Sequence, residues 1–116
     1  MDEKMTQAVM GLIMYGGDAK SSAMEAIQLA KKFDFKQAEN KLNSAHESLR
    51  RAHNSQTEML TAEAQGEKNN ISLLMIHGQD HLMTSIAFTD VAKEIVDLYK
   101  LLNEKYNTSE IDSRNF

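Results

Sequence analysis

The residues of this sequence that are best suited to chemistry lie in the stretch MIHGQDHLMT, at positions 75–84. His77 and His81 are four residues apart, so on a helix their side chains share one face. Asp80 flanks that face. Three kinds of site fit these residue types: a zinc ion held by two imidazoles, a histidine that carries a phosphoryl group, or two ordinary polar histidines on a half-buried surface. The choice between them depends on the elements that position the histidines.

The composition predicts an all-α fold. The chain of 116 residues contains no proline and only five glycines, whereas ordinary domains contain about 5% proline. Because proline interrupts helices and marks loops, its absence predicts few loops and long helices. The length fits a single domain over 1–116.

The same composition argues against several classes of function. The chain has no cysteine, which excludes a disulfide framework, a cysteine-ligated zinc site and a thiol nucleophile. The net charge is −4 and no basic cluster occurs, so we expect no nucleic-acid partner. No signal-peptide core and no apolar run of about twenty residues is present, so we expect a cytoplasmic protein without membrane insertion.

Apolar residues at spacings of three and four predict a first helix over 5–32, and Gly16 and Gly17 interrupt that pattern. The two glycines indicate either a close approach of another helix or a kink, or else room for a partner or ligand beside the backbone.

Asp34, followed three residues later by Gln37, has the pattern of a helix N-cap. A strict heptad pattern follows it as far as Glu63, and Gly66 fits the position just after a helix end. Gln56 and Glu63 break the apolar rule of that heptad, which indicates either a seam that emerges into solvent or a polar end beside a site.

A third helix is expected to begin near Asn70 to Ser72. Its predicted seam is Leu74, His77, His81, Thr84, Phe88, Val91, Ile95, Leu98 and Leu102. A second apolar face contains Met75, Leu82, Met83 and Ile86. Since three helices alone cannot cover two faces of one of them, we predict a homo-oligomer with the third helix toward its centre. The ordered core is expected at 5–105, and the polar segment 106–116 is predicted to be a flexible tail.

The placement of His77 near the start of the third helix favours anions, because free N–H groups and the helix dipole lie there. Gly78 would leave room for the backbone of a partner, and His81 could donate to phosphoryl oxygens. The carboxylate of Asp80 would repel a phosphoryl group. It must therefore point elsewhere, pair with a cation or bind a metal ion, and several copies that meet at a symmetry axis would need a metal ion or protons.

Four segments together resemble a known family: HNSQTEMLTAEAQGE at 53–67, MIHGQDHLMT at 75–84, YGGDAKS at 15–21 and DFKQAE at 34–39. They are similar to the enzyme IIA components of the lactose/cellobiose/chitobiose class of the bacterial phosphoenolpyruvate-dependent sugar phosphotransferase system. The resemblance covers roughly 5–105. It implies an antiparallel three-helix bundle that assembles as a compact homotrimer.

The resemblance also implies a function. His77 would accept a phosphoryl group from the phosphocarrier protein HPr as a tele-phosphohistidine and pass it to a cysteine of the cognate IIB component. The group would then phosphorylate a disaccharide such as cellobiose, chitobiose or lactose during uptake. Gln79 and His81 match flanking positions of that site, and Asp80 matches a ligand of a divalent ion, usually Mg²⁺, on the trimer axis. A non-catalytic, metal-stabilised scaffold or regulatory protein is the alternative, and a zinc hydrolase ranks third.

Overall fold

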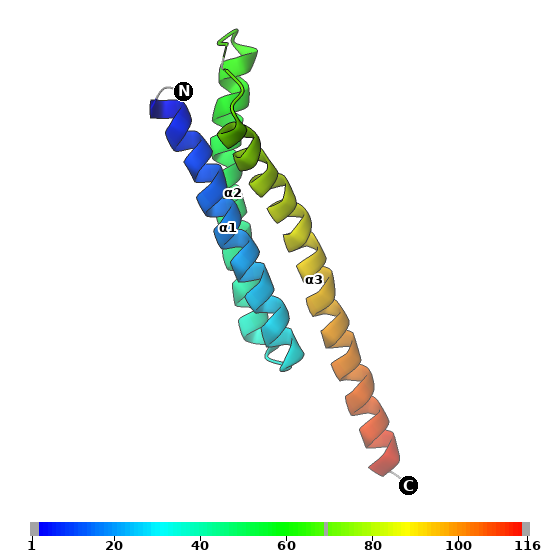
Figure 1. Ribbon diagram of the computed structural model, residues 1–116. Coiled ribbons are helices and arrows are strands. Elements are labelled where there is room, and N and C mark those ends of the chain that lie inside the picture. The colour runs from blue at the N-terminus through cyan, green and yellow to red at the C-terminus, as the bar shows by residue number, and fades with distance from the viewer. Residues whose placement is uncertain (1–2, 69, 115–116) are drawn as a thin grey trace.

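Three helices make up the described part of the chain. The computed structural model describes the backbone of residues 3–68 and 70–114, and the side chains of residues 3–68 and 70–107. Helix α1 spans Glu3–Lys31, α2 spans Phe35–Ala64 and α3 spans Leu73–Arg114. The helices alternate in direction (Figure 1). The predicted all-α, antiparallel three-helix fold is thereby confirmed.

The predicted helix boundaries agree with the observed caps. The carboxylate of Asp34 accepts a hydrogen bond of 3.3 Å from the backbone N–H of Gln37 at the start of α2. Gly66 adopts φ +92° after the end of that helix, a conformation that glycine tolerates without steric cost. The hydroxyl of Ser72 accepts from the backbone N–H of Met75 at 3.1 Å, which caps α3.

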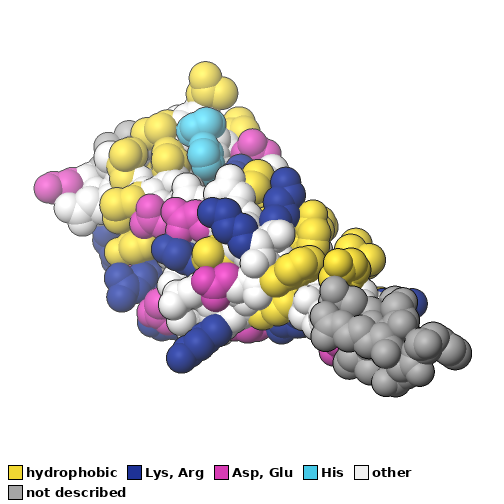
Figure 2. Space-filling model, turned by 90° about the horizontal axis from the view of Figure 1, so that it is seen from below, with side chains coloured by type: hydrophobic (Ala, Val, Ile, Leu, Met, Phe, Trp, Pro, Cys, Tyr) yellow, Lys and Arg dark blue, Asp and Glu magenta, His cyan; other side chains and the backbone are white. Residues whose placement is uncertain are grey.

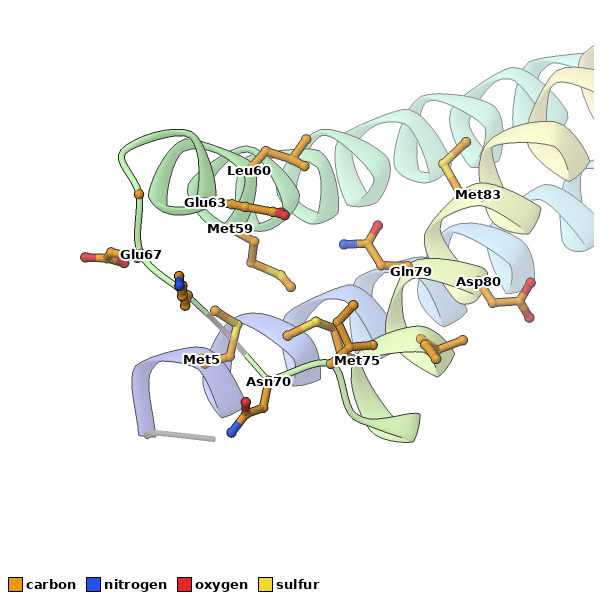
Figure 3. A pocket seen from close by; sticks show the side chains of 14 residues that line it. Met5, Met59, Leu60, Glu63, Glu67, Asn70, Met75, Gln79, Asp80 and Met83 are labelled. Atoms are coloured by element: carbon orange, nitrogen blue, oxygen red, sulfur yellow. The ribbon is translucent and has the colours of Figure 1, made fainter.

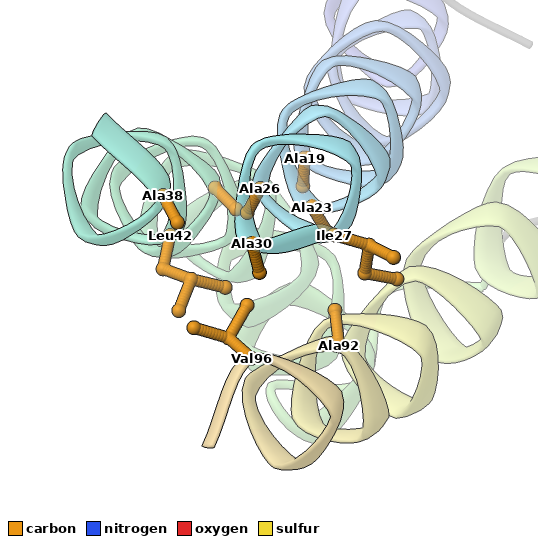
Figure 4. Close-up of a cluster of buried hydrophobic side chains, with 10 residues drawn as sticks. Ala19, Ala23, Ala26, Ile27, Ala30, Ala38, Leu42, Ala92 and Val96 are labelled. Atoms are coloured by element: carbon orange, nitrogen blue, oxygen red, sulfur yellow. The ribbon is translucent and has the colours of Figure 1, made fainter. Parts of the chain in front are cut away.

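Helix α1 forms the middle of the bundle. It packs against both α2 and α3 along much of its length, whereas α2 and α3 contact each other sparingly. The side chains where the helices meet are mostly small, so the backbones lie close together. Figure 4 shows this cluster, whose labelled members are Ala19, Ala23, Ala26, Ile27, Ala30, Ala38, Leu42, Ala92 and Val96.

The seam predicted for α3 was wrong in register. Among residues 73–107 of this helix, the buried ones are Gly78, Leu82, Ser85, Thr89, Ala92 and Val96. Of the predicted seam, Val91 and Leu98 are more than half exposed, while Phe88 and Ile95 lie half-buried at the edge of the contact with the core. The α1 backbone approaches α3 so closely that small residues, polar ones included, occupy the contact. A prediction based on the spacing of large apolar residues does not detect a buried face of this kind.

Helix α3 is longer than the sequence analysis predicted. Its backbone continues through 106–114, where we expected a flexible tail, and Figure 1 shows it extending past the loop between α1 and α2. No proline or glycine follows Gly78, so nothing in the sequence interrupts the helix. The single domain over 1–116, the core at 5–105 and the flexibility of 106–116 stay predictions, and residues 115–116 lie outside the described part.

The side of α3 that faces away from α1 carries exposed hydrophobic side chains. Leu73 is 82% exposed, Ile76 55% and Met83 56%. Figure 2 shows exposed hydrophobic side chains at several places on the face seen from below. No helix in the described part of the chain is both long and apolar enough to cross a membrane. A row of exposed hydrophobic residues is typical of a protein–protein contact. The cytoplasmic location stays a prediction.

The two adjacent glycines of α1 give a matched pair of stability predictions. A Cβ atom at Gly16 would lie 3.2 Å from the carbonyl oxygen of His81 and 3.3 Å from Oγ of Ser85, whereas one at Gly17 meets no atom within 4 Å. We expect Gly17→Ala to stabilise the fold by about 1 kcal/mol, the helix-propensity gain. Gly16→Ala should destabilise it by about 1 kcal/mol, because the α3 backbone must move.

Urea unfolding at one fixed protomer concentration measures both changes, since assembly makes apparent stability concentration-dependent. Equal stabilisation by the two alanines would contradict the close approach of α1 to the turn of α3 that contains His81.

Candidate functional site

The two histidines of α3 lie side by side, as their spacing predicts. The side chain of His77 is exposed, and that of His81 is half-buried. The centroids of the two rings are 4.5 Å apart, and the ring planes are nearly perpendicular at 79°. His77 belongs to the second turn of α3, just beyond the cap at Ser72. An exposed imidazole with a second imidazole in contact is suited to group transfer.

A buried serine fixes the backbone of α3 beneath His81. Oγ of Ser85 lies 2.7 Å from the carbonyl oxygen of Gly16 and 2.5 Å from that of His81, so its single hydroxyl proton is shared between the two acceptors. Ser85 is fully buried. The close approach at Gly16 confirms one of its two predicted roles. Ser85 was not among the residues predicted from the sequence. Its position three residues after Leu82 puts both on the inner face of α3, which could have indicated its burial.

Gly78 has a different role from the one predicted. It does not leave room for a partner beside His77, because it is buried against α1. A Cβ atom there would lie 3.1 Å from Cγ1 of Val9 and 3.3 Å from the carbonyl oxygen of Val9. The glycine therefore permits close packing of α1 on α3. Open space next to the α1 backbone occurs instead at Gly17.

One nitrogen of His81 has no hydrogen-bond partner. Nδ1 of His81 is buried and unpaired within the described part of the chain. A neutral imidazole carries one donor and one acceptor nitrogen. Burial of Nδ1 without a partner is costly in either tautomer, because it leaves a donor or an acceptor unsatisfied. The other nitrogen of the ring, Nε2, is therefore the one through which His81 can donate a hydrogen bond to a bound group.

A lysine of α1 lies on the same flank of α3 as the histidines. Nζ of Lys20 is 3.3 Å from Oγ1 of Thr84, and Thr84 follows His81 at a spacing that keeps both on one side of the helix. Lys20 belongs to the segment YGGDAKS, but the sequence analysis assigned it no role. The structure places its positive charge within one turn of His81.

Gln79 and Asp80 lie at a groove formed by the N-terminal end of α3 with α1 and α2. The groove has a volume of about 970 Å³, and its apolar lining includes Met5, Met59, Met75 and Met83. In Figure 3, Gln79 points from α3 toward Met59, whereas the carboxylate of Asp80 points away from the centre of the groove.

Asp80 is exposed, and its carboxylate makes no ion pair or hydrogen bond with the residues that the structure describes. Among those residues, no group of three or more histidine, cysteine, aspartate or glutamate side chains could hold a metal ion. The zinc interpretation of His77 and His81 therefore lacks a third protein ligand within one protomer.

Gln79 faces away from the histidines of its own protomer. It follows His77 by two positions, which on a helix turns the two side chains about 160° apart. Oε1 of Gln79 accepts a hydrogen bond of 2.8 Å from Nε2 of Gln56 on α2, and the pair is partly buried. Gln56 is one of the two polar residues that break the heptad of α2, and it is half-buried, whereas the predicted polar end beside a site stays a prediction. The other, Glu63, is exposed.

Comparison with known proteins identifies relatives over nearly the whole chain. Residues 7–100 match the family described as "PTS system, Lactose/Cellobiose specific IIA subunit". The lichenan-specific phosphotransferase enzyme IIA component of Bacillus subtilis is 46% identical over 109 residues, which cover 94% of this chain and 99% of that protein.

Solved structures agree with these sequence matches. The crystal structure of the cellobiose-specific enzyme IIA from Bacillus anthracis aligns with a TM-score of 0.87 at 44% identity, over 90% of this chain and 96% of that one. The IIA(chitobiose)–HPr complex of the Escherichia coli phosphotransferase system aligns with a TM-score of 0.74 at 33% identity, over 88% and 99%. Sequence and fold therefore point to the same group of proteins.

Proposed function

The chain belongs to the lactose/cellobiose-specific IIA family of the sugar phosphotransferase system, and we propose that it is a phosphoryl carrier that uses His77. His77 accepts the group from HPr and passes it to a cysteine of the cognate IIB component during sugar uptake. The observation that carries this proposal is the exposed ring of His77, held 4.5 Å from the ring of His81 at the start of α3. A relative of similar fold is named as a complex with HPr.

The proposed chemistry uses the neutral imidazole of His77 twice. In the first step, the lone pair of Nε2 forms a bond to phosphorus while the bond between phosphorus and HPr breaks, and that electron pair leaves with HPr. The Nδ1 proton of His77 is released to water. In the second step, a thiolate of IIB forms the P–S bond, the P–N bond breaks, and the imidazole recovers its electron pair and a proton. The sugar is not bound in either step, which fits the different sugars named for the relatives.

We expect two groups on the His77 flank of α3 to stabilise the phosphoryl oxygens. In phosphoryl transfer the charge spreads over three oxygens, and catalysis depends mainly on positioned donors and cations. Because Nδ1 of His81 is buried, this ring would donate to the oxygens through Nε2–H. The amine of Lys20 supplies positive charge one turn further along α3.

The exposed hydrophobic side of α3 supports the proposed homotrimer with α3 at its centre. Asp80 lies on this side between Ile76 and Met83, which are both more than half exposed. Three Asp80 carboxylates brought together at an axis would repel one another unless a cation joined them. Hard carboxylate oxygens suit Mg²⁺ or a similar divalent ion, and Asp80 has no other partner among the described residues. The ion would supply charge compensation there, separate from the transfer at His77.

The same arrangement gives Gln79 a role at the site. His77 and Gln79 lie at the two edges of the side of α3 that faces away from α1. Measured around the helix axis, each is about 80° from the middle of that side. When three α3 helices meet around an axis, opposite flanks of neighbours face each other. Gln79 of one protomer would therefore lie near His77 of the next, where its amide N–H groups can bind phosphoryl oxygens.

Reconstituted transfer tests the carrier role. Phosphoenolpyruvate, enzyme I, HPr and the cognate IIB component are incubated with and without this protein, and the phosphoryl group on the IIB cysteine is quantified. We expect IIB to be phosphorylated only when the protein is present. Phosphorylation of IIB at the same rate without it would contradict the proposal.

Chelation tests the proposed ion. We expect EDTA to lower the stability of the wild-type assembly by roughly 3–5 kcal/mol, because uncompensated carboxylates remain at the axis. Asp80→Asn removes those charges, so its thermal unfolding should not respond to EDTA. Native mass spectrometry and thermal unfolding, each with and without EDTA, provide the readouts. A wild-type protein whose mass and unfolding temperature ignore EDTA would rule out the structural ion.

A further inference from the structure

The bond between Gln56 and Gln79 determines which end of the Gln79 amide is free. A glutamine amide has an acceptor oxygen at one end and two N–H donors at the other. Nε2 of Gln56 lies 2.8 Å from Oε1 of Gln79, so the acceptor end of Gln79 is occupied by α2. In Figure 3 the nitrogen of Gln79 is the atom that faces the groove. The donors of Gln79 are thus left available.

We propose that Gln56 is a positioning residue for phosphoryl transfer, which holds Gln79 so that its N–H groups face the phosphoryl oxygens. This inference rests on the proposed role of Gln79 at the site of a neighbouring protomer. An unrestrained amide presents its oxygen as readily as its nitrogen, and an oxygen would repel the phosphoryl group. The hydrogen bond from Nε2 of Gln56 holds the oxygen of Gln79 against α2 and so favours the orientation in which the nitrogen faces outward.

The location of Gln56 supports this role over a purely structural one. Its neighbours in the heptad of α2, Ala52 and Met59, are buried apolar residues, as a seam position normally requires. A polar side chain there loses packing energy, and the partly buried environment makes its one hydrogen bond to Gln79 stronger than it would be in water. The polar residue at this position is therefore explained by the bond that it makes across the bundle.

Three single variants distinguish a loss of transfer caused by the orientation of the Gln79 amide from one caused by a damaged fold. Gln56→Leu frees the Gln79 amide, and we expect single-turnover transfer from phosphorylated HPr to slow about fivefold at saturation. Gln56→Glu offers only acceptors, so it should turn the Gln79 nitrogen toward α2 and slow transfer further than leucine does. Gln28→Leu, at an exposed glutamine of α1, should transfer at the wild-type rate. The HPr concentration at half-saturation should stay unchanged in all three.

A double-mutant cycle with Gln79→Leu completes the test. If Gln56 acts through Gln79, then adding Gln56→Leu to Gln79→Leu should change the rate less than about twofold. If the rate losses of Gln56→Leu and Gln79→Leu multiply in the double variant, the two residues act independently and the positioning role is overturned. A wild-type transfer rate for Gln56→Leu together with a slow rate for Gln79→Leu would overturn it too. A wild-type rate for Gln79→Leu itself would instead overturn the proposed role of Gln79, while transfer by the wild-type protein would leave His77 as the carrier. Native mass and urea unfolding identify any variant whose assembly or fold has changed.

Discussion

His77→Ala should receive no phosphoryl group from HPr and pass none to IIB, while its fold stays intact. The imidazole is the nucleophile in the proposed first step, and alanine offers no atom that can form a bond to phosphorus. The side chain is exposed and makes few contacts with the core, so its loss should change the free energy of unfolding by no more than about 0.5 kcal/mol. Transfer to IIB in the reconstituted system and urea unfolding measure the two effects.

His53→Ala is the matched control for this loss. His53 is an exposed histidine of α2, so this variant removes the same side chain from a place without proposed chemistry and should transfer at the wild-type rate. Transfer by His77→Ala at the wild-type rate would show that another residue carries the group.

His81→Ala should slow transfer by about 10- to 100-fold without abolishing it, the effect of losing one hydrogen bond to a charged group. Nδ1 of His81 is buried, so Nε2–H is the donor proposed for the phosphoryl oxygens. His81→Gln should recover part of the rate, because its amide nitrogen reaches about as far as Nε2. Single-turnover transfer from phosphorylated HPr measures both rates.

The pair of substitutions at His81 also identifies the carrier. If His81 were the nucleophile, the glutamine variant would be as inactive as the alanine variant, and His77→Ala would still be phosphorylated. If both His81 variants transferred the phosphoryl group at the wild-type rate, His81 would not be a hydrogen-bond donor to the phosphoryl oxygens.

The helices and their ends could be predicted from the sequence because local chemistry determines them. Asp34, Gly66 and Ser72 act at helix ends through their own side chains or backbone angles, which depend little on distant residues. The burial pattern of α3 could not be predicted in the same way. Its inner face depends on how closely α1 approaches, and that distance follows from small residues such as Gly16 and Gly78 on both helices at once.

The same distinction between local and distant contacts applies to the candidate site. The pairing of His77 with His81 follows from their spacing on one helix, so it was predictable. The bonds from Ser85 to Gly16 and from Gln56 to Gln79 join residues on different helices, 69 and 23 positions apart in the chain. No short sequence pattern reveals such partners. The heptad of α2 marked Gln56 as an exception, but only the packed bundle shows which residue it meets.

Intact-protein mass spectrometry after incubation with phosphoenolpyruvate, enzyme I and HPr is the most direct test of the central claim, that His77 carries the phosphoryl group. We expect one added phosphoryl group per wild-type protomer, lost on mild acid treatment as expected for a phosphohistidine, and no addition to His77→Ala. An unshifted wild-type mass, with the donor proteins shown to be active on a control acceptor, would contradict it. So would an acid-labile phosphoryl group that persists in His77→Ala.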